Sequence, residues 1–414
     1  MFRDPFRGRL ATAYRVSVRF LSRRTTDCKT ASVNGKGDPP YRRLLLQWHI
    51  TERCNLRCAH CYQEGAAGAE LSLPELIGIL GQFKTLLDQV EARWGVPTTG
   101  HINVTGGEPF IRPDFPDLLK AMAAEKPRIT FGVLTNGTFI DGKTAKALSK
   151  LGPTAVQVSI EGTEATHDRI RGAGNLRRTV AAVRNLVRHE VPASISFTAH
   201  RLNYREFPEV ARLGRKLHAL RVWSDRHIPI GNGCGFETLT PEEARELFGL
   251  MRTARLEAEA AWFGKTKISM IRALQFMAGG RPYQCKAGDA LITILPNGDL
   301  VPCRRMPIHV GNVLTDGLSK LYFESEILLG LRDRTRVSEG CEACKFERHC
   351  RGGLRCLSYA VNGTPFRADP GCWLASRTAC TEAGSAEPGD AADTRIAGGG
   401  QVAHQGAAQP GQHG

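Results

Sequence analysis

Short apolar segments alternate with amphipathic ones through most of the chain. Runs rich in Val, Ile and Leu predict buried strands at residues 43–51, 101–107, 129–137, 155–162, 193–200 and 221–231. Apolar residues at helical spacing predict helices at residues 71–94, 113–125, 142–151, 176–190 and 207–220, and another helix that begins at Thr240. Ser72 and Glu75 form a capping box for the first of these helices, and Pro241 and Glu243 support the start of the last.

The regular order of strand and helix predicts an α/β protein, because parallel strands need a crossover connection that is usually a helix. Such a sheet is either doubly wound or curled into a partial barrel. In both architectures ligands bind beyond the carboxyl ends of the strands. We therefore look for chemistry in the segments that follow the predicted strands.

The two ends of the chain differ from this pattern. Residues 1–43 hold eleven Lys and Arg against three acidic residues, a large part of the net charge of +15. This leader is open to interpretation as a transit peptide, a polyanion-binding arm or an upstream extension, and we expect residues 1–40 to be disordered. The segment 381–414 is rich in Gly, Ala, Pro and Gln, and we expect a disordered tail. Few aromatic residues accompany the basic leader, which disfavours nucleic-acid binding.

The cysteines indicate metal binding or catalysis. The chain of 414 residues has thirteen of them, too few for a disulfide scaffold of this size, and no apolar secretory signal precedes them. No run of eighteen apolar residues is present, so we expect neither a membrane span nor a membrane partner. These features predict a cytoplasmic protein with reduced thiols.

Three cysteines, Cys54, Cys58 and Cys61, directly follow the first predicted strand. Thiolates grouped in this way bind zinc or an iron–sulfur cluster, and both metal centres normally take four ligands. His60 is the only further candidate within the loop, and it is adjacent to Cys61. Three protein ligands leave one iron of a cluster open, which suits a cluster that binds and reduces a small molecule.

This loop, with Tyr62 behind it and the "TGGEP" segment at residues 105–109, resembles the radical S-adenosylmethionine (radical SAM) superfamily. The resemblance implies a partial (β/α)6 TIM-like barrel over residues 41–265, whose three cysteines hold a 4Fe–4S cluster. It also implies that the cofactor, S-adenosylmethionine, is bound at the strand ends. The residues concerned are Tyr62; Gly106, Gly107 and Glu108 for the methionine amino group; Asn136, Ser159 and Glu161 for the ribose hydroxyls and the amino-acid part; and Arg171 for the carboxylate.

A second group of cysteines resembles the SPASM extension of radical SAM enzymes, a small Cys-rich domain that holds two auxiliary iron–sulfur clusters. We expect it at residues 266–380. By this resemblance one auxiliary cluster is held by Cys341, Cys344, Cys350 and Cys372, and the other by Cys285, Cys303 and Cys356. The spacing from Cys350 to Cys356 departs from the family, because five residues separate them instead of three. Cys341 and Cys344 also have the Cys-x2-Cys spacing of zinc sites, so a zinc-ribbon module is an alternative.

The resemblance implies reductive cleavage of S-adenosylmethionine to a 5′-deoxyadenosyl radical that abstracts hydrogen from a substrate. We expect the substrate to be a peptide or protein side chain, which receives a crosslink, a thioether or an oxidation. A tetrapyrrole, as in haem biosynthesis, is the alternative substrate, and a zinc-stabilised binding protein is the alternative from another class. Expected partners are a reductant such as flavodoxin or ferredoxin, and a separate protein that recognises a leader peptide.

Overall fold

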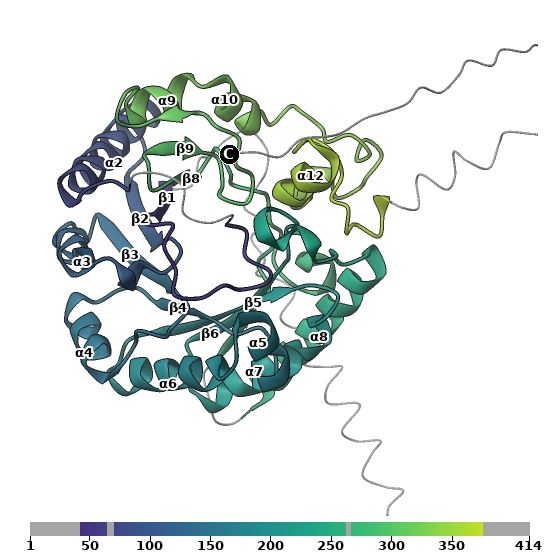
Figure 1. The fold of residues 1–414 in the computed structure, drawn as a ribbon. Coiled ribbons are helices and arrows are strands. Elements are labelled where there is room, and N and C mark those ends of the chain that lie inside the picture. The colour runs from purple at the N-terminus through teal and green to yellow at the C-terminus, as the bar shows by residue number, and fades with distance from the viewer. Residues whose placement is uncertain (1–41, 64–69, 262–265, 376–414) are drawn as a thin grey trace, which may run out of the picture.

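The computed structural model describes residues 42–63, 70–261 and 266–375. The predicted leader at residues 1–40 and the predicted tail at 381–414 lie outside the described residues. The chain forms one sheet that curves into a ring, with helices around its outside (Figure 1). This arrangement confirms the partial barrel among the two architectures that the strand and helix pattern allowed.

The strands of the sheet are β1 (Arg42–His49), β2 (Thr98–Thr105), β3 (Ile129–Thr135), β4 (Val156–Ser159), β5 (Ala193–Ala199), β6 (Arg221–Arg226), β7 (Lys267–Ser269), β8 (Leu291–Ile294), β9 (Asp299–Val301) and β10 (Gly311–Asn312). Strands β1 to β7 are neighbours in chain order and all run parallel. On its other side β1 pairs in parallel with β8, and β9 and β10 add two antiparallel pairings. The six strands predicted from the sequence are β1 to β6, and the sheet ends at β7 and β10, so the barrel is open.

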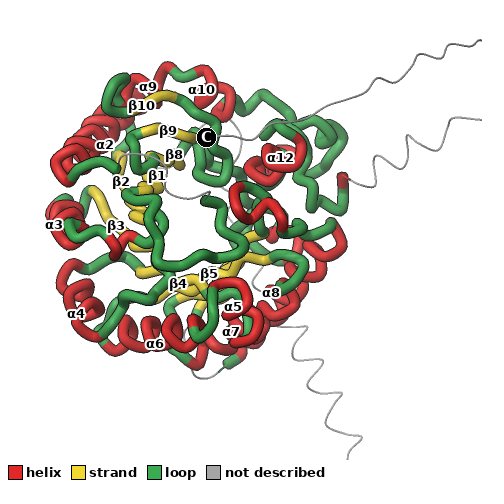
Figure 2. Tube along the Cα trace, in the orientation of Figure 1, coloured by secondary structure: helices red, strands yellow, loops and turns green. Residues whose placement is uncertain are grey.

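The long helices lie outside the ring of strands, as the tube trace shows (Figure 2). They are α2 (Leu73–Trp94), α3 (Phe115–Ala124), α4 (Gly142–Leu151), α5 (Glu164–Arg171), α6 (Asn175–Arg188), α7 (Phe207–Lys216) and α8 (Pro241–Ala260). The predicted capping pairs are present, because Glu75 accepts hydrogen bonds from the backbone N–H and hydroxyl of Ser72, and Glu243 accepts one from Thr240. The sequence pattern did not predict α5 as a separate helix.

Successive side chains of a strand point alternately to the apolar core under the helices and to the interior of the barrel. In β1, Leu44, Leu46 and Trp48 are fully buried in the same apolar core as the helices. The residues between them, Leu45 and Gln47, line a cavity inside the ring. A period of two along a strand thus gives one face to the helices and the other to the barrel interior.

The segment after residue 265 continues the sheet and then forms small helices. These are α9 (Leu318–Glu324), α10 (Glu326–Arg332), α11 (Glu347–Cys350) and α12 (Arg355–Asn362). A buried ion pair joins this segment to the barrel, because Arg226 at the end of β6 donates to Asp369 at 2.7 Å. The cysteine-rich part is therefore fixed to the carboxyl end of the barrel strands. In the described part of the chain, no helix has both the length and the apolar character needed to cross a membrane.

The packing of α7 on β6 gives a test of this architecture. A Cβ atom at Gly214 of α7 would lie 2.3 Å from Cγ2 of Val222, so Gly214→Ala should overpack the interface and destabilise the protein by about 1–3 kcal/mol. The control is Gly249→Ala in α8, where a Cβ atom meets nothing within 4 Å and removing a mid-helix glycine should stabilise by about 0.5–1 kcal/mol. Anaerobic urea unfolding measures both changes, and a midpoint for Gly214→Ala at or above the wild type would contradict the packing.

Candidate active site

A cavity of about 780 Å³ lies at the carboxyl ends of the barrel strands. Its wall includes strand-end residues such as Thr105, Thr135 and Asp225. Two groups of cysteines that are far apart in the sequence meet on this wall: Cys54, Cys58 and Cys61 from the first loop, and Cys285, Cys303 and Cys356 from the C-terminal segment. The sequence predicted both groups, and the structure shows that they share one chamber.

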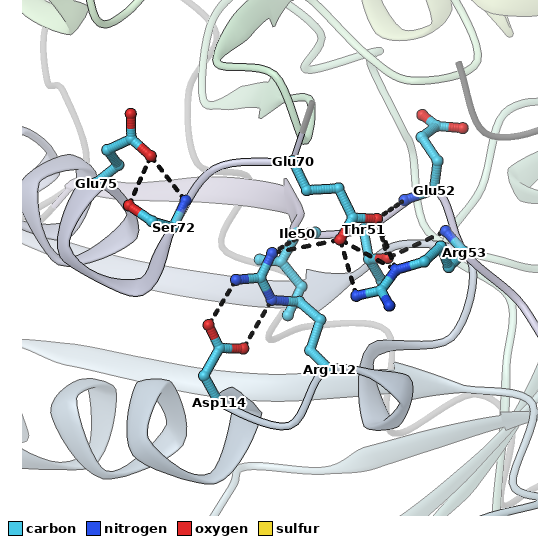
Figure 3. A network of polar contacts seen from close by, with 9 residues as sticks. All are labelled: Ile50, Thr51, Glu52, Arg53, Glu70, Ser72, Glu75, Arg112 and Asp114. Atoms are coloured by element: carbon cyan, nitrogen blue, oxygen red, sulfur yellow. Dashed lines mark hydrogen bonds and ion pairs between the residues drawn. The ribbon is translucent and has the colours of Figure 1, made fainter. Parts of the chain in front are cut away.

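The loop that carries the first three cysteines is anchored by Glu70 (Figure 3). The Glu70 carboxylate accepts hydrogen bonds from the Thr51 hydroxyl, from the Glu52 backbone N–H at 3.1 Å and from the Arg53 guanidinium at 3.0 Å. Arg112, whose guanidinium lies 3.6 Å from Glu70, donates to the backbone carbonyl of Ile50 at 3.0 Å. The chain is thus held at four successive residues before it reaches Cys54.

Gly106 and Gly107 lie directly against this anchored segment. The Gly107 N–H donates to the carbonyl of Thr51 at 2.8 Å, and the Glu108 N–H donates to the carbonyl of Arg53 at 2.9 Å. A Cβ atom at Gly107 would lie 2.3 Å from the Arg53 carbonyl oxygen, and one at Gly106 would lie 2.4 Å from that of Thr51. Both glycines are therefore required for the approach of two backbones, in addition to any contact with a ligand.

Glu108, the predicted partner of the cofactor amino group, is fully buried. Its carboxylate accepts hydrogen bonds from the Thr135 hydroxyl at 2.8 Å, from the Asn136 N–H at 2.8 Å and from the Phe110 N–H at 3.2 Å. Burial raises the pKa of Glu108 to about 7, although these hydrogen bonds favour the ionised form. In this structure Glu108 fixes the strand end that presents Asn136.

Asn136 lines the cavity beside the first cysteine loop. Its side-chain amide donates to Asn55 Oδ1 at 2.9 Å and lies 3.8 Å from the sulfur of Cys54. The amide oxygen accepts from the Thr138 N–H at 2.9 Å, which fixes its orientation. Sequence reasoning identified Asn136 but missed Asn55, which follows the first cysteine and bridges to it.

Arg171 and Glu161 form a buried ion pair next to Cys58. The Arg171 guanidinium lies 2.6 Å from Glu161 Oε1 and 3.7 Å from the sulfur of Cys58. Burial opposes ionisation of Glu161, but Arg171 and the nearby His60 hold the pKa of Glu161 below its usual value. The second carboxylate oxygen accepts from the Thr198 N–H at 2.8 Å. Arg171 lines the cavity, whereas Glu161 is fully buried behind it.

Ser159 and Tyr62 complete the predicted cofactor residues, and both line the cavity. The Ser159 hydroxyl lies 3.3 Å from that of Ser196, which projects from the neighbouring strand. The Tyr62 ring packs edge-on against His49 and below the guanidinium of Arg304. Burial raises the pKa of Tyr62, so its hydroxyl remains protonated.

Two thiols of the first group, those of Cys54 and Cys58, are held in surroundings that disfavour an isolated thiolate. Burial raises the pKa of Cys54 and Cys58, and Arg171 opposes this effect at Cys58. A bound cation removes this penalty, because metal binding deprotonates coordinating thiols. Three thiols facing a chamber with Arg171 beside them therefore fit the iron–sulfur cluster expected here.

The described cysteines of the C-terminal segment line two separate cavities, and Cys285, Cys303 and Cys356 face the large one. Cys341, Cys344, Cys350 and Cys372 line a second, much smaller cavity. Burial, and then repulsion from neighbouring cysteines or Asp369, raises the pKa of Cys341 and of Cys350 to about 12. Within the described residues, no three His, Cys, Asp or Glu side chains are placed to hold a single metal ion.

Sequence reasoning missed Asp369, a buried acidic residue that lies close to the C-terminal cysteines. Asp369 accepts hydrogen bonds from Arg226, from the Leu354 N–H at 2.8 Å and from the Gly371 N–H at 2.9 Å. It thereby fixes the backbone just before Cys356 and Cys372. The one sequence signal for it was its position in the "DPGC" segment, three residues before a cysteine.

Comparison with known proteins identifies the domains that carry these features. The Radical SAM superfamily matches residues 48–214, and SPASM, an iron–sulfur cluster-binding domain, matches residues 285–345. The chain is 25% identical over 344 residues to the AdoMet-dependent heme synthase of Methanosarcina barkeri, covering 79% of this chain and 95% of that protein. It is 28% identical over 345 residues to the PqqA peptide cyclase of Gluconobacter oxydans, and the match covers 80% of this chain and 90% of that protein.

Among solved structures, the fold resembles SuiB of Streptococcus suis bound to its precursor peptide SuiA. The TM-score is 0.62 at 17% identity, over 79% of this chain and 75% of that one. The chain is a radical SAM enzyme, whose cofactors are iron–sulfur clusters and S-adenosylmethionine. Within that class it belongs to the enzymes that carry a SPASM domain. The match favours a radical SAM enzyme over the alternative of a zinc-stabilised binding protein.

The contact between the glycine pair and the anchored loop predicts the effect of a small substitution. Gly107→Ala would place a Cβ atom against the Arg53 carbonyl, so we expect the first cysteine loop to shift and about one cluster to be lost. The control is Gly235→Ala, where a Cβ atom meets nothing within 4 Å. Iron and sulfide content after anaerobic reconstitution measures the effect. A full complement of clusters in Gly107→Ala would show that the loop tolerates the displacement.

Proposed function

We propose that this enzyme modifies a side chain of a peptide or protein, by a crosslink, a thioether or an oxidation. The observation that carries the proposal is the shared cavity, in which the first cysteine loop and the Cys285, Cys303 and Cys356 set face the same space. A substrate in that space reaches both a radical-generating site and an auxiliary cluster. Such an arrangement suits a reaction that both removes a hydrogen atom and withdraws an electron.

The first cluster is assigned to Cys54, Cys58 and Cys61, in a barrel domain at residues 41–265. One auxiliary cluster is assigned to Cys341, Cys344, Cys350 and Cys372, and the other to Cys285, Cys303 and Cys356, in a domain at residues 266–380. When bound, the first cluster and S-adenosylmethionine supply an electron and then an adenosyl radical that removes a hydrogen atom from the substrate. The protein supplies binding, orientation and the exclusion of water.

The cofactor residues have distinct tasks in this proposal. Arg171, fixed by the fully buried Glu161, offers a positive charge at the cavity wall to the cofactor carboxylate. Asn136 and Ser159 present polar groups at two strand ends for the ribose. Glu108 acts through Asn136, whose backbone it holds. Tyr62 closes the site on the side of the first loop.

The two auxiliary sites differ in what they can contact. Cys285, Cys303 and Cys356 line the large cavity and are therefore the set that faces the substrate. Cys341, Cys344, Cys350 and Cys372 line a separate small cavity. We assign two alternative tasks to the auxiliary cluster in the large cavity: it accepts an electron from the substrate, or it binds a substrate thiolate. The auxiliary cluster in the small cavity then passes the electron on.

A peptide substrate is supported by relatives and structural neighbours whose names refer to peptides, namely the PqqA peptide cyclase and SuiB with its precursor peptide. The AdoMet-dependent heme synthase keeps a tetrapyrrole as the second candidate. A flavodoxin or ferredoxin as reductant and a separate leader-peptide recognition protein complete the proposed partners.

Radical generation should depend on the first cysteine loop. The triple variant Cys54→Ala, Cys58→Ala, Cys61→Ala should bind about four fewer irons per chain, one cluster, because its three thiolate ligands are gone. It should also form no 5′-deoxyadenosine from S-adenosylmethionine under reducing conditions. Iron analysis and chromatography measure the two effects. Cofactor cleavage that persists in this variant would refute the assignment.

Substrate modification should depend on the auxiliary set as well. Wild-type enzyme, incubated anaerobically with peptides encoded beside its gene, should change the mass of one peptide and leave iron coproporphyrin III unaltered. Cys350→Ala should still cleave S-adenosylmethionine but yield no modified peptide, because radical generation needs only the barrel. Mass spectrometry follows both products.

The matched control is Cys234→Ala, which removes an exposed thiol outside the three sets and should behave as wild type. Circular dichroism establishes that Cys350→Ala is folded. Loss of cofactor cleavage in a folded Cys350→Ala variant would refute the division of labour. Conversion of the porphyrin in place of any peptide would favour the second candidate.

A further inference from the structure

A charged cluster on the wall of the large cavity has more positive than negative groups. Asp225, at the carboxyl end of β6, lies 2.9 Å from Arg305 and 3.7 Å from Arg272. All three side chains line the cavity. The other carboxylate oxygen of Asp225 accepts from the backbone N–H of Arg226 at 3.0 Å. One carboxylate thus faces two guanidinium groups, and only Arg305 is within hydrogen-bond distance of it.

Arg305 has a partner within hydrogen-bond distance. Its Nη1 donates to Asp225 Oδ2 at 2.9 Å, and Arg305 lines the cavity together with Cys303 and Cys356. Arg305 therefore has no need of a substrate group.

The Arg272 side chain has no hydrogen-bonded acceptor among the described residues, because Asp225 lies 3.7 Å from its Nε. Its guanidinium carbon lies 4.6 Å from the ring centre of Trp223 and 6.0 Å from that of Tyr283. Its Nε is buried and has no hydrogen-bond partner among the described residues. Trp223 is held in place because its indole N–H donates to Gln157 Oε1 at 3.2 Å. The guanidinium is thus stacked on a fixed aromatic surface.

We propose that Arg272 binds a carboxylate group of the substrate. A planar guanidinium presents paired donors that match a carboxylate, and stacking on an aromatic ring orients the pair without consuming its donors. The Arg272 side chain is 31% exposed and pairs only at 3.7 Å with Asp225 among the described residues, so an incoming carboxylate gains charge-assisted hydrogen bonds without displacing one. This proposal rests on the proposed function only in placing the substrate in the large cavity.

A carboxylate can belong to an acidic side chain or the C-terminus of a peptide, or to a propionate of a tetrapyrrole. The test therefore uses two probes with enzyme that carries its clusters and S-adenosylmethionine. The first is a randomised peptide library selected for anaerobic binding. The second is iron coproporphyrin III, compared with its tetramethyl ester, which lacks free carboxylates, by visible absorption.

Three variants are compared with the wild type. Arg272→Gln removes the charge, and Arg272→Lys keeps the charge but removes the planar pair of donors. Arg281→Gln is the matched control, because Arg281 is an exposed arginine of the same segment. We expect Arg272→Gln to weaken binding of the carboxylate-bearing probe about 10- to 100-fold, with Arg272→Lys intermediate and Arg281→Gln unchanged. Affinity for S-adenosylmethionine should be the same in all four proteins.

The outcomes separate the two proposals. Acidic peptides bound in an Arg272-dependent way support both. Binding of the porphyrin but not its ester, lost in Arg272→Gln, supports the carboxylate site and contradicts the peptide function. Selected peptides that bind equally well without acidic side chains and with an amidated C-terminus, or an acidic preference that survives in Arg272→Gln, overturn the carboxylate site and leave the peptide function standing. A wild-type enzyme that binds neither probe also overturns it, as does weaker cofactor binding in Arg272→Gln.

Discussion

The pairing of two loop backbones is the constraint on which the rest of the site depends. The carbonyls of Thr51 and Arg53 accept hydrogen bonds from the segment that begins at Gly107, and the closeness of that contact leaves no room for a Cβ atom. Glu70 and Arg112 hold the same loop by further hydrogen bonds to its backbone. Because the loop is fixed before it reaches Cys54, the three thiols need little further ordering when a cluster binds.

The sequence predicted those elements of the fold that depend on residues within the same short segment. Strands β1 to β6 follow from apolar runs, and the starts of α2 and α8 follow from their capping residues. The sets of cysteines that share a cavity were predicted through family resemblance, since spacing alone is compatible with zinc. The glycine pair was predicted to approach a ligand, whereas the structure shows that it also approaches backbone.

What the sequence did not predict depends on partners far away along the chain. Nothing near residue 291 indicates that β8 pairs with β1, because that choice depends on where the barrel closes. The interaction of Asp369 with Arg226 likewise joins residues that no pattern relates. Asp225, Arg305 and Arg272 acquire their significance only from one another and from the cavity that they share. Charge balance of this kind is a property of three-dimensional proximity.

The parallel pairing of β1 with β8 has a consequence for synthesis of the protein. β1 leaves the ribosome first, while β8 belongs to the C-terminal segment, so one edge of β1 lacks its partner until most of the chain has been made. An unpaired strand edge is a template for association with other chains. A fragment that ends at residue 265 would keep that edge permanently. The cluster-binding segment therefore also shields the first strand of the barrel, and the two domains are not interchangeable modules.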